Sequence, residues 1–219
     1  MEIEFKYQAT FDQGSQLIGD LSRKYGADIR LIPMDAVYYD TEDRALRDIH
    51  VAYRIRTEGD QTVLTVKYGK GSDKSTKGLY RRQEENFVVG PDFREKPGID
   101  VLEDIPVYKE MDKAVGGQYS DLLGVMLPLK KLVPVMEMQF TRRELDVPLN
   151  DEGAIAVVSY DDGIISAGGR EERISEVEIE LKEGSEADLI GFSEEIASKY
   201  GLLPGLKSKY SRGIKLLNE

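Results

Sequence analysis

The chain opens with charged residues at alternating positions, Glu2, Glu4 and Lys6. Side chains two residues apart in a β-strand point to the same face, so these three would form a charged face opposite Ile3 and Phe5. Carboxylates bind hard divalent cations, and lysine ammonium groups bind phosphate oxygens. A solvated surface strand has the same alternation, so this segment indicates metal and phosphate chemistry only if the pattern recurs.

The pattern does recur, at alternating positions of several later strand-like segments. Carboxylates from two strands could hold one divalent cation while basic groups from other strands hold a polyanion, and no Cys, His or Ser nucleophile is needed. The sequence therefore predicts metal-assisted phosphoryl transfer. The positions concerned are Glu2, Glu4, Lys6, Arg54, Arg56, Lys67, Arg82, Glu84, Glu176 and Glu178, with Lys209 near the end of the chain.

Composition limits the kind of site. The chain has 219 residues, no Cys and one His, which excludes disulfides, thiolate nucleophiles and Cys-based or multi-His metal sites. Any metal must then have oxygen ligands, which favours Mg²⁺ or Mn²⁺. The net charge of -11 argues against nonspecific nucleic-acid binding but not against a small anionic ligand.

The length suits one domain, residues 1–219, and no linker-like stretch divides it. No apolar run is long enough to span a membrane, and a charged strand stands where a signal peptide would have its apolar region. We therefore expect a cytoplasmic protein that binds neither membranes nor nucleic acid. The sequence does not decide between a monomer and a homodimer.

Periodicity and turn residues predict the elements that would position these charges. Helices are predicted at 12–26 and 185–200, the second with Ser185 as its N-cap and Gly201 past its end. A β-hairpin, 155–160 with 163–166, is predicted around the turn signature Asp161-Asp162-Gly163. Other strands are predicted at 37–41, 51–56, 62–68, 79–89, 133–147 and 174–181, and a mainly helical, irregular region at 90–131.

These elements predict an α+β fold built on an eight-stranded antiparallel β-barrel. The helices have apolar stripes that must be buried, and the apolar strand faces are their available partners on the outside. The charged faces would then line the interior. That interior must be a solvated tunnel, because an unpaired buried charge costs roughly several kcal/mol.

Short motifs along the chain stand in the order known from one family. They are Glu2-Ile3-Glu4-Phe5-Lys6, Tyr38-Tyr39-Asp40-Thr41, Arg54-Ile55-Arg56, Thr65-Val66-Lys67, Arg82-Gln83-Glu84, Glu176-Val177-Glu178-Ile179-Glu180 and Ser208-Lys209-Tyr210-Ser211-Arg212-Gly213. The series resembles the CYTH or triphosphate tunnel metalloenzyme superfamily, over essentially the whole chain except 90–130. The resemblance implies an eight-stranded antiparallel tunnel that binds triphosphate compounds.

The resemblance also implies roles for the acidic residues. Glu84 would hold a second metal ion or orient water, and it counts with Glu2, Glu4 and Lys6 as catalytic. Asp161 matches an acidic position beside the tunnel. Glu180 shares a face with the metal-binding glutamates but is expected beyond the tunnel mouth. The divalent cation would be bound by Glu2, Glu4, Glu176 and Glu178.

Basic residues would bind the phosphate oxygens. On the sixth strand Arg142 fits the resemblance, whereas strict alternation from Glu137 and Gln139 points Arg143 inward, and a bulge would reconcile the two. Glu137 and Gln139 would also stand where many relatives have basic residues. The expected phosphate ligands are Lys6, Arg54, Arg56, Lys67, Arg82 and Arg142, with Lys209 closing the far side.

Within this superfamily, the stretch 78–84 and the long C-terminal portion look more like the bacterial inorganic triphosphatases than the compact cyclases. The expected activity is metal-dependent hydrolysis of inorganic triphosphate to pyrophosphate and phosphate. A class IV adenylyl cyclase and a thiamine triphosphatase rank lower, because no base pocket is recognisable. A noncatalytic polyphosphate- or nucleotide-binding module is a third alternative, and the intact carboxylates on both metal-binding strands argue against it.

Overall fold

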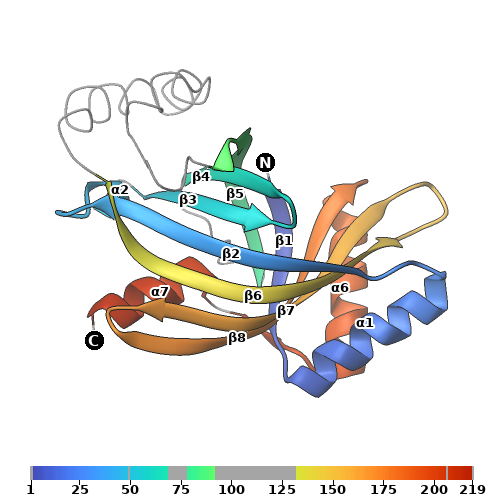
Figure 1. Cartoon of the computed structure of the whole chain (residues 1–219). Helices are drawn as coiled ribbons and strands as arrows, with labels where there is room; N and C mark the ends of the chain where they lie inside the picture. The colour runs from blue at the N-terminus through green and yellow to red at the C-terminus, as the bar shows by residue number, and fades with distance from the viewer. Residues whose placement is uncertain (1, 49, 69–77, 92–131, 206, 219) are drawn as a thin grey trace.

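The computed structural model describes residues 2–48, 50–68, 78–91, 132–205 and 207–218 (Figure 1). The predicted helical and irregular region at 90–131 lies almost entirely outside the described residues. The described elements are β1 (Glu2–Gln8), α1 (Phe11–Tyr25), β2 (Arg30–Thr41), α2 (Ala45–Asp48), β3 (Val51–Glu58), β4 (Gln61–Tyr68), β5 (Leu79–Val89), β6 (Leu132–Pro148), β7 (Ile155–Ala167), β8 (Arg170–Glu183), α6 (Glu186–Tyr200), β9 (Leu203–Pro204) and α7 (Lys209–Asn218).

The strands form one antiparallel sheet that curls back on itself, with the order β5-β4-β3-β2-β6-β7-β8-β1-β9. Strand β5 also pairs with β1, from Glu2 opposite Arg82 to Phe5 opposite Leu79, which joins the two ends of the sheet. Eight strands therefore form a ring of hydrogen-bonded neighbours, and the short β9 adds to β1. The predicted eight-stranded antiparallel barrel is confirmed, and so is the α+β class.

Helices α1 and α6 cover the outer face of β1, β7 and β8 (Figure 1). Thr10 and Gln13 form a capping box at the start of α1, and Gly26 ends that helix in the left-handed conformation. In α6, Ser185 is the N-cap and Gly201 ends the helix in the left-handed conformation, both as predicted. Phe5 and Tyr7 of β1 lie in the core between these helices and the sheet, whereas Glu4 and Lys6 face the opposite way, into the barrel.

The close packing of α1 on β7 depends on Gly14. A Cβ at Gly14 would lie 2.3 Å from the ring of Tyr160, which is fully buried, whereas a Cβ at Gly191 of α6 would have no neighbour within 4 Å. We expect Gly14→Ala to lower the free energy of unfolding by about 1–3 kcal/mol through overpacking. Gly191→Ala should raise it by about 0.5–1 kcal/mol through helix propensity. Urea unfolding measures both, and two changes of the same sign would contradict this packing.

Helix α7 packs inside one end of the barrel, against strand faces that also contribute to the interior (Figure 1). Leu216 and Ile214 of α7 belong to a core with Met136 of β6 and Ile165 of β7. This helix was not predicted from the sequence. The interior is therefore charged in its middle and apolar where α7 enters.

The predicted hairpin around Asp161-Asp162-Gly163 is wrong. Strand β7 runs unbroken through these residues, and the turn lies at Gly168 and Gly169, both with positive φ, as a two-residue hairpin loop requires. Asp161 is fully buried in ion pairs. A Cβ at Gly163 would lie 2.1 Å from the backbone oxygen of Gln139, so this glycine permits close strand packing. Tertiary contacts override the local turn signature here.

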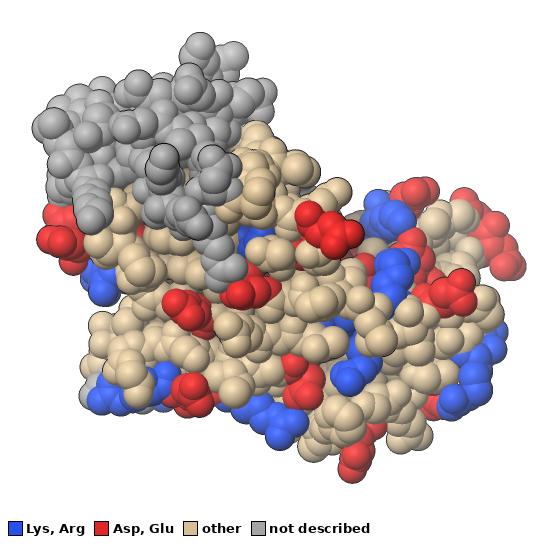
Figure 2. All heavy atoms as spheres, viewed as in Figure 1, with Lys and Arg blue, Asp and Glu red and all other residues tan. Residues whose placement is uncertain are grey.

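Charged side chains on the outer surface are mixed in sign. On the face shown in Figure 2, the described Lys and Arg are interspersed with Asp and Glu, and no continuous basic patch forms there. None of the described helices has both the length and the apolar character needed to cross a bilayer.

Candidate active site in the barrel interior

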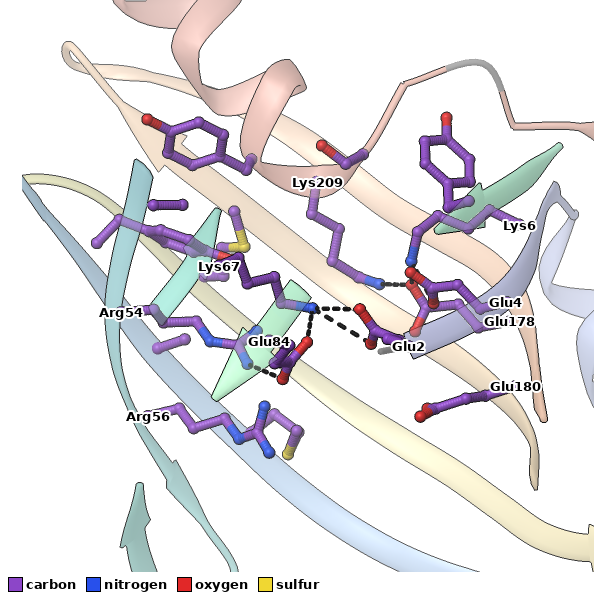
Figure 3. Close-up of a pocket in the computed structure, with 18 of the residues that line it drawn as sticks. Glu2, Glu4, Lys6, Arg54, Arg56, Lys67, Glu84, Glu178, Glu180 and Lys209 are labelled. Atoms are coloured by element: carbon purple, nitrogen blue, oxygen red, sulfur yellow. Dashed lines mark hydrogen bonds and ion pairs between the residues drawn. The ribbon is translucent and has the colours of Figure 1, made fainter. Parts of the chain in front are cut away.

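The barrel encloses a cavity of about 370 Å³ whose lining is unusually rich in charge. Its uncharged wall comes mainly from β2, β6 and α7, including Tyr38, Met138 and Tyr210. Charged side chains come from β1, β3, β4, β5, β6, β8 and α7 and converge on the middle of the cavity (Figure 3). They are the basic Lys6, Arg54, Arg56, Lys67, Arg142 and Lys209 and the acidic Glu2, Glu4, Glu84, Glu178 and Glu180.

One side of the cavity is acidic, where β1 and β8 run side by side (Figure 3). Glu4 lies directly opposite Glu180 in the strand register, an arrangement of like charges that is destabilising without a counter-cation. Burial, with Glu4 and Glu178, raises the pKa of Glu180 to about 7. Burial also raises the pKa of Glu2 to about 7, against the opposing effect of Lys67 and with a further contribution from Glu4.

The other side is basic, with Arg54 and Arg56 on β3 and Lys67 on β4 (Figure 3). Lys67 bonds Glu2 at 3.1 Å and forms an ion pair with Glu84, and Arg54 lies 3.9 Å from Glu84. Burial would raise the pKa of Glu84, but Lys67 and Arg54 outweigh it and lower that pKa. Burial and then the neighbouring Arg54 lower the pKa of Arg56. An anion placed among these groups would relieve that repulsion.

A buried network of ion pairs links β1, β6, β7 and β8. Lys6 donates to Glu4 at 2.7 Å and to Glu178 at 2.5 Å. Arg142 holds Asp161 with two hydrogen bonds, of 2.8 and 2.7 Å, and donates to Glu178 at 2.6 Å. Burial would lower the pKa of Lys6, but Glu178 and Glu4 outweigh it and raise that pKa well above its usual value.

Helix α7 is tied into this network from the end of the barrel. Lys209 lies 2.8 Å from Asp161 and 3.0 Å from Glu178, and it also pairs with Glu176. Arg212, one helical turn further on, donates to Glu176 at 2.8 Å. Sequence reasoning missed Arg212, although helical spacing would have placed it on the same face as Lys209.

Asp161, Glu176 and Glu178 form a buried acidic triad whose oxygens lie within 4.8 Å of one another, close enough to share a metal ion. The triad is already neutralised by Lys209 and by arginines. Glu180 differs, since it has no Lys or Arg partner among the described side chains. The expectation that Glu180 lies beyond the tunnel mouth is wrong, because it lines the cavity.

Arg142 faces the cavity and Arg143 faces outward, where its guanidinium lies 5.6 Å from the ring centre of Phe11. The alternation argument for Arg143 is wrong because Glu137 and Gln139 lie on the outer, exposed face of β6. Inward positions of this strand are apolar up to Arg142, including Met138 and Phe140. No bulge is needed beside Arg142, since the register shift in the β2–β6 pair falls between Tyr38 and Tyr39.

Most of the predicted site residues are brought together by the barrel. Glu176 is buried beside the cavity and does not line it. The backbone of Arg82 pairs with Glu2, but its side chain lies outside the described part of the chain. The predicted residues that line the cavity are Glu2, Glu4, Lys6, Arg54, Arg56, Lys67, Glu84, Arg142, Glu178 and Lys209.

Comparison with known protein families identifies one that matches nearly the whole chain. The model of the CYTH domain matches residues 1–214. A curated relative, named inorganic triphosphatase, from Haemophilus influenzae, is 27% identical over 215 residues, which are 98% of this chain and 54% of the relative. The chain thus spans about half the length of the curated relative that it matches.

Solved structures show the same fold. A protein from Hippeastrum, described as having a dominant triphosphatase activity, matches with a TM-score of 0.69 and 18% identity, over 99% of this chain and 97% of its own. A protein from Bacillus halodurans matches with a TM-score of 0.58 and 19% identity, over 95% of this chain and 94% of its own. At these identities the likeness concerns the fold alone.

Proposed function

This chain belongs to the CYTH domain family, and on that premise we propose that it hydrolyses inorganic triphosphate to pyrophosphate and phosphate with Mg²⁺ or Mn²⁺. The observation that supports this most is the cavity itself, where six basic and five acidic side chains face a space of about 370 Å³. A short polyanion needs many cationic groups, and a hard divalent cation needs carboxylates. The Haemophilus relative's name agrees with this reading.

The residues present fit a divalent cation. Glu2, Glu4 and Glu180 bring three carboxylates to one side of the cavity, and Glu178 lies next to them on β8. Burial is the main cause of the raised pKa values of Glu2 and Glu180, and neighbouring carboxylates add to it; a bound cation would favour the ionised forms of both groups. These four glutamates would hold the metal, which would neutralise charge on the phosphate chain when bound. Glu176 was also predicted as a metal ligand. It would instead hold Lys209 and Arg212 in position through its ion pairs with them.

The chain's own basic groups would bind and orient the substrate. Arg54, Arg56 and Lys67 approach from one side, and Lys6 and Lys209 from the other (Figure 3). Held from both sides, the phosphate chain would be fixed in line for attack by water. Glu84, whose pKa is lowered, stays ionised at neutral pH, so it could accept a hydrogen bond from that water. No covalent intermediate is needed.

Metal binding should depend on pH. The pKa of Glu2 and of Glu180 is raised from 4.5 to about 7, so each proton is held more tightly in the folded protein. Ionising these groups destabilises the metal-free fold as pH rises through 7. Below pH 7 the cation must displace the protons of Glu2 and Glu180 in order to bind. We expect saturating Mg²⁺ to raise Tm more at pH 8 than at pH 6. An equal or larger shift at pH 6 would contradict this assignment.

Substrate choice is tested by comparing kcat/KM for inorganic triphosphate, ATP and thiamine triphosphate under one set of metal conditions. The proposal expects inorganic triphosphate to have the highest value, with pyrophosphate and phosphate as products. Cyclic AMP from ATP would identify a cyclase, and thiamine diphosphate as the main product would identify a thiamine triphosphatase. Tight triphosphate binding without turnover under Mg²⁺ or Mn²⁺ would identify a noncatalytic binding module.

A further inference from the structure

Three polar residues form a row across the barrel wall beneath the basic side of the cavity. Arg54 of β3 lies directly opposite Thr65 of β4, and Thr65 lies directly opposite Asn86 of β5. Arg54 and Asn86 line the cavity, whereas Thr65 is fully buried behind them. A buried hydroxyl in a strand requires hydrogen-bond partners, and this row supplies them.

The hydrogen bonds in the row have one possible direction. Arg54 Nη2 donates to Thr65 Oγ1 at 3.1 Å, because arginine has no acceptor. Thr65 Oγ1 donates its own proton to Asn86 Oδ1 at 2.7 Å, because Asn86 must turn its NH2 group toward the carboxylate of Glu84, which only accepts. Asn86 Nδ2 donates in turn to Glu84 Oε1 at 3.0 Å. The chain starts at a residue that can only donate and ends at a carboxylate that accepts.

This arrangement fixes the orientation of two groups that line the cavity, Arg54 and Glu84. Holding Nη2 sets the plane of the Arg54 guanidinium, and it leaves Nε as a buried donor that has no hydrogen-bond partner in the described part of the chain. At the other end, Glu84 is held 3.9 Å from Arg54 and beside Lys67. An unused buried donor next to a cavity is a group that a ligand oxygen would satisfy.

We propose that Thr65 is a positioning residue for triphosphate. Its hydroxyl holds Arg54 with Nε free for a phosphate oxygen and, through Asn86, holds Glu84 in place. The inference rests on the proposed function, because it assigns Arg54 and Glu84 to the substrate. Thr65 itself touches no substrate.

The test compares three variants. Thr65→Val keeps the branched shape and removes the hydroxyl, Thr65→Ser keeps the hydroxyl, and Thr62→Val changes another buried threonine of β4 that does not line the cavity. We expect Thr65→Val to raise KM for inorganic triphosphate about tenfold, the scale of one misplaced charge-assisted hydrogen bond. Thr65→Ser should stay within about twofold of the wild type, as should Thr62→Val.

A purely structural role would lower Tm and the active fraction without changing KM. Equal KM values for Thr65→Val and Thr62→Val would therefore overturn the proposal. So would a Thr65→Ser variant as impaired as Thr65→Val, since the hydroxyl would then not be responsible. If the wild type releases no phosphate, the proposed function fails separately. In that case the Kd of inorganic triphosphate is measured for the wild type and the three variants in place of KM. Equal Kd values for all of them would again overturn the positioning role of Thr65.

Discussion

Glu4→Gln is expected to lower kcat/KM for inorganic triphosphate by about a thousandfold or more, which corresponds to about 4 kcal/mol of transition-state stabilisation. Glu4 is buried, lies opposite Glu180 and is bonded to Lys6. The amide keeps the shape of the side chain but removes a charge from the proposed cation site, and it also leaves Lys6 with one carboxylate fewer. Steady-state phosphate release in excess Mg²⁺ measures the effect.

A matched control for this substitution is Glu137→Gln. Glu137 is exposed on the outer face of β6, so the change in formal charge is the same and the cavity is untouched. The control should keep wild-type kcat/KM and the full rise of Tm with Mg²⁺. The Glu4→Gln variant should lose most of that rise. Retention of more than about a tenth of the activity by Glu4→Gln would remove Glu4 from the metal site.

Asp161→Ala is expected to lower the free energy of unfolding by about 3–5 kcal/mol, because it leaves buried cations without one of their partners. Asp161 is fully buried and is bonded to Arg142 and Lys209. These two residues come from β6 and α7, so Asp161 joins the docked helix to the wall of the barrel. Urea unfolding at neutral pH gives the value.

Asp162, the next residue in the chain, provides a matched control for Asp161→Ala. Asp162 points to the outer face and pairs with Arg173 at 3.0 Å, where the Arg173 side chain is 66% exposed. Since exposed pairs contribute little, Asp162→Ala should cost less than about 1 kcal/mol. Similar losses for the two variants, or a loss below about 1 kcal/mol for Asp161→Ala, would show that the network does not stabilise the docked α7.

Much of the fold could be predicted because local signals agree with the tertiary structure. Alternation in residues 2–7 gives the inward and outward faces of β1, since one face meets helices and the other a polar cavity. Capping residues Ser185 and Gly201 give the bounds of α6, because an N-cap hydroxyl and a left-handed glycine satisfy helix ends locally. These signals need no knowledge of distant residues.

The errors occur where distant contacts decide. Asp161 and Gly163 resemble a turn, but one is needed for a buried ion pair and the other for close packing on β6. On β6, strict alternation from Glu137 and Gln139 points the polar face inward, whereas Met138 and Phe140 face inward in the structure because the interior also contains apolar surface near α7. Sequence alternation gives two faces but does not say which of them is inside.

In the candidate site too, the features set by local sequence could be predicted and those set by distant contacts could not. The residue types and most positions could be predicted, because strands with charged inner faces must converge in a closed barrel. The pairing of carboxylates and cations could not, since it depends on register and on the entry of α7. Glu180 and Glu176 show this, as one lines the cavity without a described Lys or Arg partner and the other is held by Lys209 and Arg212.

We expect the cavity to hydrolyse triphosphate only with a divalent cation bound to its glutamates. The most direct measurement is phosphate release from inorganic triphosphate by purified protein treated with EDTA, before and after Mg²⁺ or Mn²⁺ is added back. We predict no release before addition, and one phosphate and one pyrophosphate per triphosphate afterwards. Equal release in EDTA, or none after either metal is restored, would contradict the proposed function.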